Sequence, residues 1–144
     1  MKINFHIDPE LKEERGEFWL RKMTDNISNI TNQLSQSQYA LWCYADAEMV
    51  PVNYDDIITI CAQGGKVTVF TATNQYLYKQ RLNQLDEQLP LDFIQVSRDT
   101  IINYKKIDHL ELLENGKIDV LMITKQRVQI SRRKIKKLKE RLGI

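Results

Sequence analysis

Short apolar runs, rich in branched and aromatic residues and bounded by turn residues, recur through the chain after residue 40. This pattern is typical of β-strands. The runs cover residues 41–44, 57–61, 66–70, 75–78, 93–96, 109–113, 118–123 and 128–130. Gly64-Gly65, Thr73-Asn74 and Asn115-Gly116 separate neighbouring runs, and Asn-Gly is the strongest short hairpin signal. The pattern therefore predicts a set of antiparallel hairpins.

Helical periodicity is confined to three stretches. Between about residues 17 and 34, apolar side chains recur mostly at three- and four-residue spacing, which places them on one helix face. Two shorter helices are predicted over Leu82–Leu89, ended by Pro90, and over Arg132–Leu142, ended by Gly143. Ser131 is a suitable N-cap for the last helix. Near the N-terminus, residues 3–7 alternate as a short strand does.

A polar Gln-Ser linker at residues 35–38 divides the helical part from the extended part. We therefore predict a mainly β fold with short helices, of the α+β class. Residues 1–47 form an N-terminal strand-helix extension, and residues 48–144 form an antiparallel β domain. A chain of 144 residues is long enough for one ordinary core or for a domain with a short appendage.

The charge distribution is much less even than the net charge of +2 suggests. From Lys125 to Ile144 there are nine Lys or Arg residues and one acid, whereas residues 1–50 hold five bases and eight acids. Locally dense positive charge is typical of a surface that binds phosphate. No apolar run reaches the roughly 18–20 residues that span a bilayer, and the N-terminus lacks the apolar stretch of a signal peptide. We therefore expect a cytoplasmic protein.

The sequence offers little for catalysis or metal binding. His6 and His109 each lie in a predicted strand without a nearby nucleophile, and Cys43 and Cys61 lack Cys-x-x-Cys spacing. Buried, structural cysteines are the simpler interpretation. Gly64-Gly65-Lys66 lacks the remaining residues of a phosphate-binding loop and precedes a strand. We expect no enzyme activity, no metal and no cofactor.

Basic residues also occur at the predicted turns, outside the last helix. They are Lys66, Arg98, Lys105-Lys106 and Arg132-Arg133. Turns at one end of a β domain can converge, and converging Arg and Lys side chains can contact phosphates and base edges together. Only Tyr104 lies among these bases, so an aromatic stacking surface for single strands is not indicated. Duplex DNA fits better than a single strand.

The order of these elements resembles the LytTR DNA-binding domain of bacterial transcription regulators. The similarity covers about residues 50–144. Its most specific parts are the block from Phe93 to Asn103, and Val128-x-Ile130-Ser131-Arg132-Arg133 followed by Leu138. Further matching segments are 54–60, 66–71, Leu82-x-x-Leu85 and Ile107.

The resemblance implies an elongated antiparallel β domain that is not a helix-turn-helix. Family members insert loops into successive major grooves and occupy two direct repeats as a dimer. By position, the resemblance assigns base contacts to Lys66, Arg98 and Arg133. Charge and placement suggest further contacts with phosphates. These involve Lys105, Arg132, Lys134, Lys136 and Lys137.

Only about 45–50 residues precede the similar region, too few for the receiver domain that many family members carry. The layout resembles the stand-alone regulators, which often work with a small membrane protein that restrains them. The N-terminal extension could serve dimerisation or partner docking, or its apolar face could cover the sheet. Two other functions stay open: an RNA-binding protein, and an adaptor whose basic helix binds an acidic partner.

Overall fold

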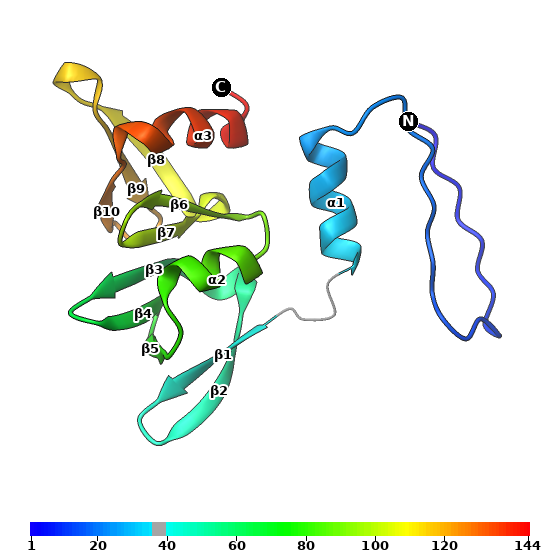
Figure 1. Ribbon diagram of the computed structural model, residues 1–144, viewed down its shortest axis with the longest axis horizontal. Helices are drawn as coiled ribbons and strands as arrows, with labels where there is room; N and C mark the ends of the chain where they lie inside the picture. Colours follow the sequence, from blue (N-terminus) through cyan, green and yellow to red (C-terminus); the bar gives the residue numbers. More distant parts are fainter. Residues whose placement is uncertain (36–39) are drawn as a thin grey trace.

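Two antiparallel sheets and three α-helices make up the computed structural model, which describes residues 1–35 and 40–144 (Figure 1). The larger sheet contains β1 (Ala40–Ala45), β2 (Glu48–Asn53), β3 (Ile57–Gln63), β4 (Lys66–Thr71), β5 (Gln75–Tyr78), β6 (Phe93–Ser97) and β7 (Thr100–Asn103). The smaller sheet contains β8 (Ile107–Leu112), β9 (Ile118–Met122) and β10 (Arg127–Gln129). The helices are α1 (Asp25–Ser35), α2 (Leu82–Gln88) and α3 (Arg132–Leu142). The mainly β fold expected from the sequence is confirmed.

The strands of the larger sheet follow the order β2-β1-β5-β4-β3-β7-β6, and those of the smaller sheet β10-β9-β8. The predicted hairpins are present. Gly64 and Gly65 join β3 to β4 with φ of 58° and 77°, a conformation that glycine adopts without strain. Asn115 and Gly116, with φ of 68° and 72°, connect β8 to β9. The pairing of β3 with β7 joins hairpins that are distant in the sequence.

The central strands are buried on both faces. On one face, Leu82 and Leu85 of α2 and its C-cap Leu89 pack against side chains of β3, β4, β6 and β7. On the other face, the smaller sheet and α3 pack on Ile58, Ile94, Val96 and Ile102, with Leu138 fully enclosed. This double coverage explains why β3 begins with four consecutive buried residues, Ile57 to Ile60, where one solvated face would require alternation.

A short motif occurs twice at the ends of strands. Asn53-Tyr54 and Asn103-Tyr104 each begin a single 3₁₀ turn, and in both cases the Asn side chain accepts a hydrogen bond from the amide two residues later. Asn103 also donates from Nδ2 to the carbonyl of Ile57 at 3.1 Å. The second copy of the motif therefore ties the end of β7 to the start of β3 inside the core.

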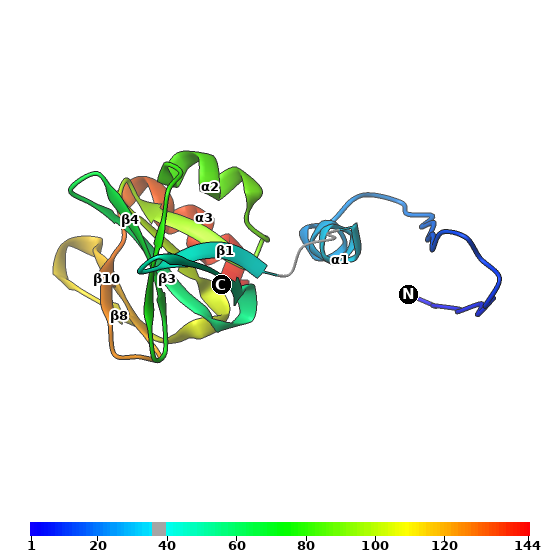
Figure 2. The same cartoon turned by 90° about the horizontal axis from the view of Figure 1, so that it is seen from below.

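The N-terminal segment differs from its prediction. Residues 3–7 form no strand, and the helix begins at Asp25, after Thr24, whereas the periodicity begins near residue 17. The strand prediction was wrong because no neighbouring strand pairs with this segment. Figures 1 and 2 both show α1 beside the sheets and residues 1–24 extending beyond it. Part of the predicted Gln-Ser linker lies outside the described residues.

Two strands, β2 and β7, were not predicted. Pro51 interrupts the run that forms β2, and β7 follows β6 after a two-residue turn without any glycine or proline. The larger sheet includes β1 and therefore begins before residue 48. The predicted cap Ser131 precedes α3, but its hydroxyl makes no capping bond. Among the described residues, none of the helices has the length and hydrophobicity needed to cross a membrane.

Candidate nucleic-acid interface

Lys66 lies at the tip of the β3–β4 hairpin. It is the first residue of β4, pairs with Gln63 across the two-glycine turn, and is exposed to solvent. The next residue, Val67, is buried, so Lys66 is anchored by the core directly behind it. The hairpin thus projects one cation from the end of a rigid strand pair.

The turn between β6 and β7 lies beside this hairpin. The amide of Ala62 donates to the carbonyl of Asp99 at 2.8 Å, which links the end of β3 to the turn. Within the turn, the Asp99 amide donates to Ser97 Oγ at 3.4 Å, and Gln95 Nε2 donates to the Arg98 carbonyl at 3.4 Å. These bonds order the turn, while Arg98 itself is exposed.

The start of α3 completes the same edge. The Ser131 amide donates to the carbonyl of Val96 at 2.9 Å, one residue before Ser97. Arg132 and Arg133 follow as the first two residues of α3, and both are exposed. Leu138, fully buried one and a half turns later, holds the helix against the sheets. The structure therefore brings Lys66, Arg98 and Arg133 to one edge of the molecule, as Figure 1 shows for the three turns.

The other predicted phosphate contacts are distributed differently. Lys105 lies in the turn at the opposite end of β7 from Arg98, and its Nζ is 3.3 Å from Asp92 Oδ2. The structure does not bring Lys105 to the edge. On α3, Lys136 is exposed and Lys134 is half-buried. The role of each residue stays a prediction.

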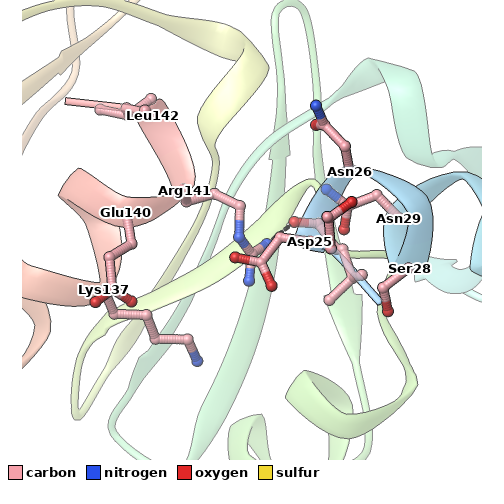
Figure 3. Close-up of a pocket in the computed structure, with 11 residues that line it drawn as sticks. Asp25, Asn26, Ser28, Asn29, Lys137, Glu140, Arg141 and Leu142 are labelled. Atoms are coloured by element: carbon pink, nitrogen blue, oxygen red, sulfur yellow. Dashed lines mark hydrogen bonds between the residues drawn. The ribbon is translucent and has the colours of Figure 1, made fainter. Parts of the chain in front are cut away.

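Lys137 lines a separate groove of about 760 Å³ between α1 and the second half of α3. Figure 3 shows Asp25, Asn26, Ser28 and Asn29 of α1 across this groove from Lys137, Glu140, Arg141 and Leu142 of α3. Arg141 donates from Nη1 to the carbonyl of Leu91, so its guanidinium is held by the body of the protein. Lys137 therefore faces a mixed polar surface that includes carboxylates of both helices.

Three further cations lie on the same edge as Lys66 and were not singled out from the sequence. Val67 pairs with Tyr78, so Lys79 and Arg81 follow β5 at the end where Lys66 begins β4. The Lys79 ammonium lies 4.3 Å from the centroid of the Tyr44 ring. Lys117 precedes β9, whose first residue, Ile118, accepts a hydrogen bond from the amide of Ile130. The hairpin register is the signal that could have identified them.

We call this surface the cationic edge. It consists of Lys66, Lys79, Arg81, Arg98, Lys117, Arg132 and Arg133. Across the part of the chain that the structure describes, the salt bridges involve Lys105, His109 and Arg127 as cations, and none involves a residue of the edge. Charges without a carboxylate partner are available to an anionic ligand.

Arg127 differs from the cations of the edge because its charge is paired with carboxylates. Its guanidinium donates to Glu111 and, at 3.0 Å, to Asp119, which is buried. The hydrogen bond from Arg127 is the main reason that the pKa of Glu111 lies below its usual value. The adjacent His109 has a raised pKa, chiefly through its hydrogen bond with Asp108. This network uses its charges internally and joins the strands of the smaller sheet.

The described residues contain no group of three or more His, Cys, Asp or Glu side chains that could hold a metal ion. Cys43 is fully buried and Cys61 partly buried, as free thiols. Burial raises the pKa of Cys43 to about 11, so its thiol is a weak nucleophile at neutral pH.

Comparisons with known proteins agree with this geometry. The family described as the LytTr DNA-binding domain matches residues 47–143. An uncharacterized HTH-type transcriptional regulator of Staphylococcus aureus strain COL is 34% identical over 146 residues, an alignment that covers 100% of this chain and 99% of the relative. The corresponding regulator of strain MSSA476 is 33% identical over the same length. A solved LytTr DNA-binding domain from Bacillus cereus superposes with a TM-score of 0.70 at 20% identity and covers 75% of this chain and 100% of that one.

Proposed function

The chain belongs to the family of LytTr DNA-binding domains, and from this premise we propose that it is a transcription regulator that binds duplex DNA through its cationic edge. The observation that carries the proposal is the convergence of three turns from separate parts of the sequence. Hydrogen bonds from Ala62 to Asp99 and from Ser131 to Val96 hold these turns side by side. Each turn ends in an exposed cation on a rigid scaffold.

The spacing of the turns suits the dimensions of B-form DNA. In the strand order β4-β3-β7-β6, the hairpin with Lys66 and the turn with Arg98 are two strand spacings apart, or roughly 10 Å. The major groove is about 12 Å wide. We propose that Lys66, Arg98 and Arg133 contact base edges there. Phosphates are contacted in this scheme by Arg132, Lys134, Lys136 and Lys137. Lys105 lies away from the edge and would contact a phosphate only where the duplex extends beyond the edge.

Two finer elements belong to the same proposal. The regulator binds direct repeats as a homodimer, which multiplies the specificity of each copy. The segment before residue 48 serves dimerisation or the docking of a partner, such as a small membrane protein that restrains the regulator. Both elements rest on the family layout, and the full-length similarity of the Staphylococcus aureus relatives includes this segment.

Selection of sites from a random duplex pool with the purified chain tests the proposal directly. We expect one enriched sequence that structured RNA does not displace, because the deep, narrow groove of A-form RNA excludes loops that fit the wide groove of B-form DNA. Equal displacement by RNA would favour the RNA-binding alternative. Absence of any duplex shift at physiological salt would favour an adaptor.

The roles within the edge can be separated by two variants of α3. Arg133→Ala should weaken binding to the selected duplex by about 1–3 kcal/mol and relax preference at one base. Lys136→Ala, on the same helix, should weaken selected and random duplexes alike. Identical losses on both duplexes for the two variants would contradict the division between base and phosphate contacts.

A further inference from the structure

The first 24 residues, here called the N-terminal arm, expose an unusual number of large apolar side chains. Phe5 is 86% exposed, Ile7 93% and Trp19 87%, and none of them touches the sheets closely enough to be buried. The remaining exposed apolar residues of the arm are Met1, Ile3, Leu11, Phe18 and Met23. Exposed apolar side chains at this density typically mark an interaction surface.

The larger sheet carries a second uncovered apolar surface, here called the sheet patch. Tyr44 of β1 pairs with Met49 of β2 on one side and with Leu77 of β5 on the other, so the three side chains share one face. Trp42, two residues before Tyr44, lies on the same face opposite Pro51. Trp42 is 54% exposed, Met49 53% and Leu77 46%. The opposite face of these strands belongs to the core, so the patch is the outer surface of the sheet.

We propose that the arm of one copy packs on the sheet patch of a second copy, and that the reciprocal contact closes a two-fold dimer. A single chain carries both surfaces and covers neither, because α1 directs the arm away from the sheets (Figures 1 and 2). In a dimer, the patch of the second copy covers the arm of the first, and the arm of the second copy covers the patch of the first. An isologous exchange of this kind leaves no unsatisfied arm or patch.

The available area matches the requirement of a stable dimer. Phe5, Phe18 and Trp19 bury about 150–250 Å² each when fully enclosed, so their exposed parts alone supply roughly half of the ~800 Å² that each partner contributes to a standard interface. The aliphatic side chains of the arm supply the remainder. Because the exchange is reciprocal, each copy contributes both an arm and a patch.

Charges at the border of the patch agree with this occupant. Lys79 stacks over Tyr44 at the margin of the patch, close to the cationic edge. In the arm, four glutamates accompany two bases between residues 10 and 17. When this acidic part of the arm crosses the basic margin of the sheet patch, the opposite charges attract. The proposal rests on the homodimer of the proposed function and specifies the contact that forms it, in the absence of DNA.

Sedimentation equilibrium of the full chain without DNA tests the exchange. The parent protein should be a dimer. Phe5→Ser/Trp19→Ser in the arm and Trp42→Gln/Leu77→Gln in the patch should each raise the dimer dissociation constant by about 30-fold or more, since buried aromatic anchors dominate such interfaces. Leu112→Ser is a matched control, because Leu112 is 78% exposed on β8, outside the patch, and this variant should stay dimeric.

A mixing experiment separates exchange from other effects. The arm variant retains its patch and the patch variant retains its arm, so an equimolar mixture should form heterodimers through one remaining contact, at concentrations where each variant alone is monomeric. Unchanged thermal unfolding of the monomers verifies that the substitutions leave the fold intact. A monomeric parent protein, or a dimer that neither double substitution weakens, would overturn the proposal. Retained dimerisation with no duplex binding would instead contradict the proposed function alone.

Discussion

Duplex affinity should fall with salt at a slope set by the cations that touch phosphate. Seven cations without a carboxylate partner among the described residues are free to touch phosphate in the proposed scheme. Four belong to the cationic edge (Lys79, Arg81, Lys117 and Arg132), and three follow on α3 (Lys134, Lys136 and Lys137). If each neutralises one phosphate, the logarithm of the binding constant falls with the logarithm of salt concentration at a slope of roughly −6, about −0.9 for each contact. A fourfold rise in salt would then weaken binding by roughly 4,000-fold.

Single neutralisations at the two ends of the edge make this prediction specific. Lys117→Gln and Arg81→Gln should each make the slope less steep by about 0.9, on selected and random duplexes alike. Lys125 provides a matched control for Lys117, because it is also an exposed turn lysine but follows the opposite end of β9. Lys125→Gln should leave the slope unchanged, as should Lys105→Gln at the far end of β7.

The assay is fluorescence anisotropy of a labelled duplex, titrated with the full chain at several salt concentrations. Thermal unfolding of each variant shows whether a loss of affinity comes from a loss of folded protein. If Lys125→Gln changes the slope as much as Lys117→Gln does, the contacting surface is not the edge. A parent slope near −2 would also contradict the reasoning, because most of the seven cations would then be distant from phosphate.

Three further predictions concern the scaffold behind the edge. Leu138→Ala should lower the free energy of unfolding by about 2–5 kcal/mol, measured by urea denaturation, because Leu138 is fully buried between α3 and the sheets. Asn103→Ala should cost about 1–3 kcal/mol in the same assay, since it leaves the buried carbonyl of Ile57 without its donor; an unchanged midpoint would contradict that role. Cys43, whose pKa is raised to about 11, should react with iodoacetamide in the folded protein at least about 100-fold more slowly at pH 8 than after denaturation, and an equal rate would show that the thiol is accessible.

Local signals in the sequence were sufficient for most of the strands and turns. Gly64-Gly65 and Asn115-Gly116 require positive φ, which fixes a tight turn wherever apolar runs flank them, and both hairpins are present. The strand β7 was missed for the opposite reason. The turn that precedes β7, Arg98-Asp99, contains no glycine. Three of the four residues of β7 are buried, so neither a turn residue nor an alternation of apolar and polar residues marks this strand.

The convergence of the turns depends on long-range pairing that no local pattern contains. Lys66 and Arg98 lie on the same edge because β3 pairs with β7, and Arg133 lies there too because the Ser131 amide donates to Val96 of β6. The resemblance to a known family supplied this arrangement, whereas charge and spacing alone also suggested Lys105, which lies elsewhere. In the N-terminal segment, amphipathic periodicity overestimated the helix, because a helix face without a packing surface gains little from its pattern.

The arrangement of the helices does not match a helix-turn-helix. A helix-turn-helix needs two helices joined by a turn of three or four residues. Among the described residues, five strands separate α1 from α2, and five others separate α2 from α3. Of the three helices, α2 reaches the cationic edge only through its N-cap, Arg81, and α3 only through its first turn, while the apolar side chains of α3 hold it to the sheets. A recognition helix would instead present its whole length to the groove. If DNA is read by the hairpin ends, as we propose, specificity depends on the rigidity of the core behind them, and a core substitution such as Leu138→Ala should then weaken DNA binding as well as stability.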